Sequence, residues 1–483
     1  MKKILIRAHM SPFDNWNAEQ VLKHDRVGTN AGNMIFTNSL MRTLMTEDVQ
    51  IDTFNTRRDL TPENLERINS EYSCVVLPFA NAFRTTFQRE LQSITKFVKQ
   101  LKIPCVVAGI GVSASFANPL KEKNSFDDAA KDFLKVILDK SALIGTRGEV
   151  TGEYLKKLGF QEESHYRVIG CPSMYWYGEQ LPYIEKHELT SQSPVSVNWK
   201  IDLPEPIHVF MRENMAKFEN IQYVPQIMDE MRLMYYGTPF PSGKYKKITE
   251  NYPSRPDHPL YTGGKAVSFI NPQTWFAYMQ EKQFSFGSRI HGNITALLSG
   301  TPSYVIVSDY RISELVEYHN IPHINFQDLK EGDDIFSLYE KADYSKLYDG
   351  HQKRFENYIQ FLEKNGLDHI FKENRYQAGF ASAQNSVEVV SGAIPAEDVE
   401  VRAASQEQLL CPYDRKMASM DLQPALYPFF SVPVEEQARR LMEVQKAYTA
   451  LQRRFDDVKS LETILKLYRM DKGVKWLLKK FKK

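Results

Sequence analysis

The chain has 483 residues, too many for one typical domain, and its 42% hydrophobic and 25% charged residues are the composition of an ordinary globular protein. Its 61 Lys and Arg balance 60 Asp and Glu, which argues against a generally basic nucleic-acid-binding protein. The four cysteines, at positions 74, 105, 171 and 411, have neither disulfide-framework nor zinc-site spacing, which favours a reducing compartment.

The N-terminal apolar run is too short for a signal peptide. Ile4-Leu5-Ile6 is followed at once by Arg7 and His9, so we predict a buried strand there. No stretch reaches the ~18 apolar residues that a membrane-spanning helix needs. We therefore expect a cytoplasmic protein.

Short apolar runs alternate with amphipathic stretches over the first 170 residues. The predicted strands are Ile4–Arg7, Val49–Phe54, Cys74–Pro78, Pro104–Gly109, Ala142–Thr146 and Arg167–Ile169, and the predicted helices span 33–46, 86–101, 126–139 and 149–158. Such alternation is typical of a parallel sheet, and the continuous apolar strands indicate that both of its faces are covered. Residues 1–180 are thus predicted to form a Rossmann-like domain.

A second domain of the same kind is expected after a break. The prolines and polar residues of 181–206 predict an interdomain linker. The pattern then restarts over 207–375, with predicted strands at Ile207–Phe210, Ile221–Val224, Val267–Ile270, Phe284–Phe286 and Ser303–Val307, helices at 211–218, 226–236, 272–281, 290–299 and 311–319, and one long closing helix at 343–366.

The predicted fold class is therefore α/β, with two Rossmann-like parallel-sheet domains that face each other across a cleft. Ligands of such sheets bind at the carboxyl ends of the strands, so the crevice between the domains is the expected site.

The remaining chain has a different character. Residues 376–432 are polar and weakly periodic, which predicts a linker, and 433–483 are predicted to be helical. Apolar residues recur there every seven positions, in the two series Leu441, Tyr448, Phe455 and Val444, Leu451, Val458, Leu465. This stripe fits either a helix that packs on its own protein or a short coiled coil between protomers.

The C-terminal end is basic and amphipathic. Residues 460–483 hold eight Lys and Arg against two Asp and Glu, with Val474, Leu477, Leu478 and Phe481 on one helical face. Such a segment can lie on an anionic membrane surface, or it can be a solvated, frayed terminus.

The stretch Phe284–Asp309 contains the strongest chemical signal. A predicted strand ends at Phe286, and Ser288, Arg289 and His291 follow where a helix begins. A helix start favours an anion, Arg289 adds a planar cation, and a histidine can exchange a proton near neutral pH. The alternative is a structural arginine–carboxylate pair beside a hydrogen-bonded histidine.

Arg147 holds the equivalent position in the first domain, directly after the strand Ala142–Thr146. Two arginines at two strand ends would face one cleft and suit a small ligand with two acidic groups. The alternative is a surface salt bridge from Arg147 to Glu149 or Glu153.

Dinucleotide, P-loop and zinc-protease motifs are absent from the sequence, and the paired aspartates at 127–128 and 333–334 are not convincing metal ligands.

Taken together, these motifs resemble the polysaccharide pyruvyl transferase family over about residues 1–330. The matching elements are Thr29–Asn33 with Phe36 and Leu40 (the family's N-x-G-D loop and helix), Val106–Gly111 (G-[IV]-G), Thr146–Gly159 (R-[DE]-x-x-S-x-x-x-L-x-x-L-G) and Phe286–Asp309 (G-x-R-[LI]-H-x-x-x-x-[AS]-x-x-x-G-x-P).

The chain departs from this family pattern at several positions. Asn33 stands where Asp is usual, Gly148 and Thr151 replace Asp/Glu and Ser, Cys171 replaces the Asp of an Asp-Pro pair, and the usual Lys after Asp309-Tyr310-Arg311 is missing.

The resemblance implies a fold like that of GT-B glycosyltransferases, with phosphoenolpyruvate as donor and ketal formation on two hydroxyls of a sugar. In that scheme Arg147, Ser288, Arg289 and His291 bind the donor in the cleft, and Asn33 and Gly111 face the acceptor. His291 is the candidate general acid, and Arg289 and Arg147 are also counted as catalytic, with Arg289 stabilising charge as phosphate leaves. No cofactor or metal is required.

The acceptor is expected to be a lipid-linked repeat unit of capsule, exopolysaccharide or wall polymer, and the basic tail would hold the enzyme on the inner face of the membrane. Two rival functions stay open on the sequence alone. One is a glycosyltransferase that uses a nucleotide sugar, and the other is a non-catalytic scaffold of polysaccharide assembly.

Overall fold

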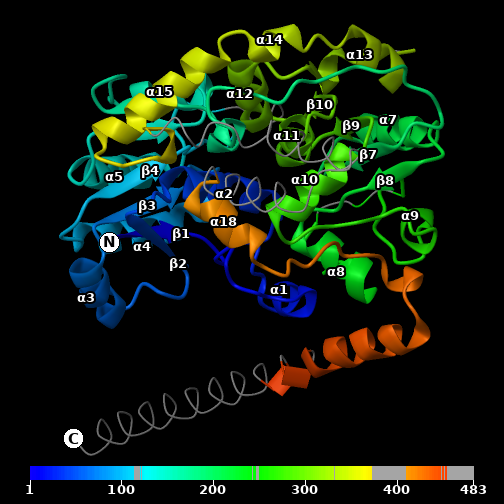
Figure 1. Cartoon of the computed structure of the whole chain (residues 1–483), viewed down its shortest axis with the longest axis horizontal. Helices are drawn as coiled ribbons and strands as arrows, with labels where there is room; N and C mark the ends of the chain where they lie inside the picture. Colours follow the sequence, from blue (N-terminus) through cyan, green and yellow to red (C-terminus); the bar gives the residue numbers. More distant parts are fainter. Residues whose placement is uncertain are drawn as a thin grey trace, which may run out of the picture.

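Two parallel β-sheets with helices packed around them form the body of the protein (Figure 1). The computed structural model describes residues 1–113, 120, 122–241, 243–245, 248, 250–330, 332–372, 410–447, 449–450 and 452–453. The α/β fold class with two parallel sheets is confirmed.

The first sheet has the strand order β2-β1-β3-β4, and every pairing in it is parallel. A bridge between Ile110 and Thr146 extends it towards the parallel pair β5–β6. The strands are β1 (Lys2–Arg7), β2 (Val49–Phe54), β3 (Cys74–Pro78), β4 (Cys105–Ala108), β5 (Ile144–Thr146) and β6 (Tyr166–Val168). All six strands predicted from this part of the sequence are present.

Successive residues of these strands are buried on opposite faces of the sheet. Ile4 and Ile6 of β1 join one hydrophobic cluster, and Leu5 joins the other. This alternation explains the uninterrupted apolar runs, because a strand that is covered on both sides needs no polar face. The surrounding helices are α1 (Ala18–His24), α2 (Gly32–Leu44), α3 (Pro62–Glu71), α4 (Gln88–Lys99), α5 (Asp127–Leu138) and α6 (Glu149–Lys157).

The second sheet has the order β11-β10-β9-β7-β8, again entirely parallel. Its strands are β7 (Val195–Asn198), β8 (Ile221–Tyr223), β9 (Phe284–Gly287), β10 (Ser303–Val307) and β11 (His323–Asn325). Its helices are α7 (Glu205–Met215), α8 (Met228–Tyr236), α9 (Pro259–Thr262), α10 (Pro272–Gln280), α11 (Ile290–Leu298), α12 (Tyr310–His319) and α13 (Ile335–Lys341).

Three of the elements predicted between residues 181 and 270 were wrong. The stretch 181–206 is more than a linker, because it contains the inner strand β7. Ile207–Phe210 is not a strand but part of α7, which follows Pro204 and has Pro206 in its first turn, where proline is favoured. The predicted strand Val267–Ile270 makes only isolated bridges near its start, at Ala266 and Ser268.

The two halves share a hydrophobic core. Helix α2 of the first half packs against α11 of the second, and buried residues of both sheets belong to one contact cluster. The predicted long helix 343–366 is two helices, α14 (Ser345–Tyr348) and α15 (His351–Lys364), which are separated at Gly350 with φ +70°. Helix α15 returns to the first half, where Asn357 donates to the Val168 carbonyl, and Asn365, just beyond its end, accepts from the Ala142 amide.

The predicted linker 376–432 is only partly described, and its described portion is packed rather than loose. Helix α18 (Pro412–Ala418) lies against α2, with Tyr413 fully buried. Asp414 accepts three hydrogen bonds of 2.7–3.1 Å from Arg42, a residue of α2 whose side chain is 3% exposed. A buried arginine needs such a partner, so this pair fixes the segment to the body.

A helix begins at residue 434 and forms an arm at the lower right of Figure 1. Leu441 is 52% exposed, whereas Val444 packs against the core. Of the two predicted heptad series, only these two residues are described, and the basic segment 460–483 lies outside the described residues.

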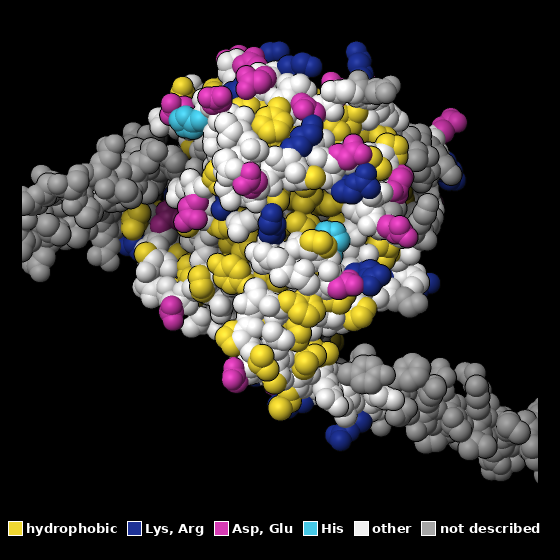
Figure 2. Space-filling model, turned by 90° about the vertical axis from the view of Figure 1, so that its right-hand side faces the viewer, with side chains coloured by type: hydrophobic (Ala, Val, Ile, Leu, Met, Phe, Trp, Pro, Cys, Tyr) yellow, Lys and Arg dark blue, Asp and Glu magenta, His cyan; other side chains and the backbone are white. Residues whose placement is uncertain are grey.

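Figure 2 shows this side of the molecule with hydrophobic side chains gathered at its lower end. In the described part of the chain, no helix is long and apolar enough to cross a membrane.

Substitution of Asp414 by Asn is expected to lower the free energy of unfolding by about 3–5 kcal/mol, because it leaves the buried Arg42 cation without its carboxylate. The matched control is Glu47→Gln, which alters the exposed pair to Arg415 and is expected to cost less than about 1 kcal/mol. Urea unfolding of both variants measures the difference. Equal losses would contradict a structural role for the buried pair.

Candidate functional site

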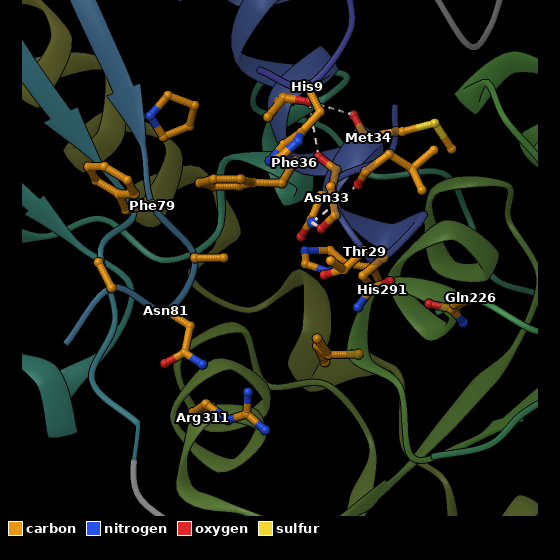
Figure 3. A pocket seen from close by; sticks show the side chains of 18 of the residues that line it. His9, Thr29, Asn33, Met34, Phe36, Phe79, Asn81, Gln226, His291 and Arg311 are labelled. Carbon is orange, nitrogen blue, oxygen red and sulfur yellow. Dashed lines mark hydrogen bonds between the residues drawn. The ribbon is translucent and has the colours of Figure 1, made fainter. Parts of the chain in front are cut away.

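A cavity of about 570 Å³ lies between the two halves and is lined by residues of both. Five of the six predicted site residues line it, namely Asn33, Arg147, Ser288, Arg289 and His291. Figure 3 shows Asn33 and His291 close together in the cavity, with Asn81 and Arg311 near each other on one side.

Arg147 follows β5, as predicted, and its side chain is buried. Its backbone amide donates to the Ile110 carbonyl at 3.0 Å, and its Nη1 donates to the Ala80 carbonyl. Among the described residues, Nε has no hydrogen-bond partner and no carboxylate lies within 4.0 Å of the guanidinium. The alternative of a surface salt bridge to Glu149 or Glu153 is therefore wrong. A buried cation without an ion-pair partner is poised to take an anion.

Gly111 was predicted to face the acceptor, but it lies beneath Arg147 and does not line the cavity. A Cβ atom at this position would stand 2.3 Å from Cδ of Arg147 and 2.8 Å from the Ala80 carbonyl oxygen. The glycine is needed because the arginine side chain crosses directly over the backbone.

Arg289 has a carboxylate partner, in agreement with the structural alternative. Its Nη2 donates to Oε1 of Glu230 at 2.6 Å, and its Nε donates to the Trp199 carbonyl at 2.7 Å. Glu230 is fully buried, so the two charges neutralise each other inside the protein. Arg289 is thus less available to a ligand than the sequence predicted. Its neighbour Ser288 accepts from the Lys200 amide at 3.1 Å.

His291 lies in the first turn of α11 and packs on the N-terminal end of α2. A Cβ atom on Gly32 would stand 2.8 Å from Cβ of His291. The imidazole Nε2 is 3.7 Å from Sγ of Cys171. Burial, together with repulsion from Arg147, lowers the pKa of His291 to about 3. The ring is therefore neutral at physiological pH while the cleft holds no anion.

The loop that precedes α2, and with it Asn33 in the first turn of this helix, joins the two walls of the cavity. The Ala31 amide donates to the Gln226 carbonyl at 2.8 Å, and the Met228 amide donates to the Thr29 carbonyl at 2.9 Å. Asn33 itself donates through Nδ2 to the Gly28 carbonyl at 2.9 Å, which holds the loop closed.

Several lining residues were missed in the sequence. Arg84 follows β3, Arg311 follows β10 and Lys200 follows β7, so all three stand beyond the carboxyl ends of strands. The strand-end rule that located Arg147 could also have found Arg84 and Arg311. Lys200 could not be found in this way, because β7 was not predicted.

The described residues include no group of three or more His, Cys, Asp or Glu that could hold a metal ion.

A comparison with protein-family models gives one match, polysaccharide pyruvyl transferase, over residues 30–310. The chain belongs to this family. It is therefore an enzyme of the pyruvyl transferase type, and the family implies a sugar or polysaccharide acceptor. No curated protein sequence matches the chain.

Solved structures with a similar course of the chain come from several organisms. The UDP-GlcNAc 2-epimerase of Methanocaldococcus jannaschii is 11% identical with a TM-score of 0.40, and the match covers 75% of this chain and 99% of that one. The UDP-GlcNAc 2-epimerase of Neisseria meningitidis is 11% identical with a TM-score of 0.37, covering 76% and 100%. The glycosyltransferase SnogD of Streptomyces nogalater is 10% identical with a TM-score of 0.28, covering 75% and 96%.

Two departures from the pyruvyl transferase pattern occur together in space. A Cβ atom on Gly148 would stand 2.7 Å from Cβ of Glu314, a buried residue of α12. Glu314 accepts from the Thr151 amide at 3.0 Å and from its hydroxyl at 3.0–3.1 Å. Glu314 also attracts Arg147 electrostatically, whereas burial raises the pKa of this carboxyl to about 7. A carboxylate from the second half thus approaches the place where the family pattern has Asp or Glu after the arginine.

Substitution of Gly111 by Ala is expected to weaken binding of phosphoenolpyruvate, the donor that the sequence resemblance implies, by about tenfold or more, because the new methyl group displaces the Arg147 side chain and its charge-assisted contacts. Isothermal titration with phosphoenolpyruvate measures the loss. Gly152→Ala is the control, since a Cβ atom there is 3.3 Å from its nearest neighbour and lies inside α6. Unchanged binding in Gly111→Ala would show that the position of Arg147 does not matter.

Proposed function

We propose that this pyruvyl transferase moves pyruvate from phosphoenolpyruvate onto two hydroxyls of a sugar, where it forms a cyclic ketal. The observation that carries the proposal is Arg147, a buried guanidinium at the cavity wall with no carboxylate in salt-bridge range among the described residues. Phosphoenolpyruvate offers a carboxylate and a phosphate, and a buried unpaired arginine is suited to one of them.

The reaction needs one proton on the donor and two sugar hydroxyls. Protonation of the methylene carbon of phosphoenolpyruvate turns it into a methyl group and leaves a cationic centre at carbon 2. The first hydroxyl bonds to carbon 2 and loses its proton. The bond between carbon 2 and the bridging oxygen of the phosphate group then breaks, and inorganic phosphate leaves. The second hydroxyl bonds to carbon 2 and closes the ketal ring. The two hydroxyls release two protons. One of them restores the proton that the general acid gave to carbon 3, and the other leaves with phosphate.

His291 fits the proton-transfer role only after the donor binds. In the free protein burial, and then repulsion from Arg147, disfavour its charged form, so the ring cannot serve as a general acid. A multiply charged anion beside Arg147 cancels that repulsion and raises the pKa of His291. Donor binding would thereby load the proton that the first step consumes. Cys171 supports this order of events, because a thiol next to Nε2 does not stabilise an imidazolium as a carboxylate would.

The acceptor is proposed to be lipid-linked. This proposal is supported by the basic sequence 460–483, which suits an anionic membrane surface. Deletion of these residues should reduce both membrane association and activity on a lipid-linked acceptor, and full retention of both would refute it. An oligomer formed through the heptad helix stays a prediction.

The donor is tested by phosphate release from phosphoenolpyruvate in the presence of a panel of nucleotide-linked and polyprenyl-linked sugars. Arg147→Gln and His291→Asn are each expected to lower the rate about 100-fold or more, because they remove anion stabilisation and proton transfer. Arg57→Gln is the control, since Arg57 lines the same cavity but pairs with Glu90 at 2.8 Å. Release of a nucleotide from a sugar nucleotide would instead indicate a glycosyltransferase.

Binding of phosphoenolpyruvate is expected to take up a proton at pH values above about 3, because His291 is neutral there in the free protein and its pKa rises beside the bound anion. Isothermal titration in two buffers of different ionisation enthalpy measures the uptake. His291→Asn should remove the protein's share and retain only the share that comes from the ligand's own phosphate. The same uptake in both proteins would assign the proton to another group.

A further inference from the structure

The cavity holds more positive charge than the proposed donor site uses. Eight Lys and Arg line it, and Asp202 is the only acidic residue in the described lining. Buried or half-buried carboxylates behind the wall neutralise part of this charge: Glu90 pairs with Arg7 and Arg57, Glu230 with Arg289, and Asp309 with Lys200 and Arg311. Arg84 has no such partner within 4.0 Å among the described residues.

We propose that Arg84 and Arg311 form a phosphate-binding subsite that spans the two halves of the protein. Arg84 comes from the loop after β3, and Arg311 comes from the first turn of α12. The subsite adds a phosphate-binding element to the cavity of the proposed function. Only the identity of the phosphate that binds there rests on the proposed function.

The two guanidinium groups converge on one neutral side chain. Nη1 of Arg84 donates to the backbone carbonyl of Asn81. Rotating the side-chain amide of Asn81 by 180° from the orientation drawn in Figure 3 satisfies both of its polar atoms, and its oxygen then accepts from Nη1 of Arg84 at 3.1 Å and from Nη1 of Arg311 at 3.0 Å. Figure 3 shows Asn81 and Arg311 near each other at the edge of the cavity. An amide oxygen fixes the two groups in place, but it carries no charge that could offset their repulsion.

Each arginine is also held from behind. Nε of Arg84 donates to the Thr86 hydroxyl at 3.1 Å, and its guanidinium lies 5.1 Å from the centre of the Phe87 ring. Arg311 donates through Nε and Nη2 to Asp309 at 3.1 and 2.7 Å, but Asp309 also pairs with Lys200 at 2.9 Å. Burial and then repulsion from Arg311 lower the pKa of Arg84 to about 10. Two prearranged cations with a surplus of charge are suited to a phosphate dianion.

The same geometry removes Arg289 from this task. Its guanidinium is neutralised by the buried Glu230, whereas the Arg84–Arg311 pair keeps its surplus and faces the cavity. Arg147 donates to the carbonyl of Ala80, the residue directly before Asn81, so the subsite adjoins Arg147. A ligand with a carboxylate and a phosphate could therefore contact Arg147 and the subsite together.

Inorganic phosphate is the probe that tests the subsite without any assumption about turnover. Saturable binding to the full chain is expected by isothermal titration, with about tenfold or greater weakening in Arg84→Gln and in Arg311→Gln. Arg84→Lys should retain part of the affinity, because it keeps the charge but loses the planar fork. Arg57→Gln is the matched control and should change the affinity by less than about twofold, since the Arg57 side chain is 56% exposed, pairs with Glu90 and is screened by solvent. Absence of phosphate binding to the wild type, or equal weakening in Arg84→Gln and Arg57→Gln, would overturn the proposal.

Competition experiments then identify the source of the phosphate. Displacement of inorganic phosphate by phosphoenolpyruvate assigns the subsite to the donor. Simultaneous binding of phosphate and phosphoenolpyruvate, with displacement by a sugar nucleotide, assigns it to a phosphate of the acceptor. Either result supports the subsite. Should the wild type release no phosphate from phosphoenolpyruvate with any acceptor, the proposed function would fail, but binding of inorganic phosphate through Arg84 would still stand.

Discussion

The buried ion pair between Arg289 and Glu230 is the interaction on which the cleft depends. Glu230 also accepts from the amides of Gln226 and Ile227 at 2.9 and 3.1 Å, so it orders the turn before α8 as well as the start of α11. That turn forms the hydrogen bonds to the loop of the first half. Because a buried carboxylate that loses its arginine is costly, the pair holds both walls of the cavity in position. The arginine that the sequence suggested as a ligand is thereby used for architecture.

The sequence predicted the first sheet well, because each of its strands is a continuous apolar run bounded by turn residues. It failed where the pattern is short or mixed. The strand β7 (VSVN) carries polar residues between prolines, and its surroundings were mistaken for a linker. Polar composition also hid the packing of 410–432, since Tyr413 and Asp414 are satisfied by residues far away in the sequence. Of the site, the strand-end arginines could be predicted, whereas the carboxylates that pair with them could not. Glu230 lies 59 residues before Arg289, and no local spacing connects the two.

The departures from the family pattern have physical partners in this chain. Gly148 leaves room for Glu314, and Thr151 supplies the hydroxyl that this carboxylate accepts from. Cys171 places a thiol beside His291 where the family pattern has a carboxylate. The acidic side chain that attracts Arg147 most strongly, Glu314, thus comes from the second half of the molecule and lies beyond salt-bridge range. The electrostatic state of the arginine and of the histidine therefore depends on contact between the two halves.

The pairing of Asp414 with Arg42 also bears on the connectivity of the chain. The segment 410–432 is attached to the body by a buried ion pair, by the hydrogen bond from Tyr413 to Asn38, and by the bridge between Leu426 and Ser268. None of these contacts requires a continuous backbone between residues 372 and 410. A single cut by a protease within that stretch would leave two polypeptides that stay together as a non-covalent complex, and two separately expressed fragments divided there could assemble into one working enzyme.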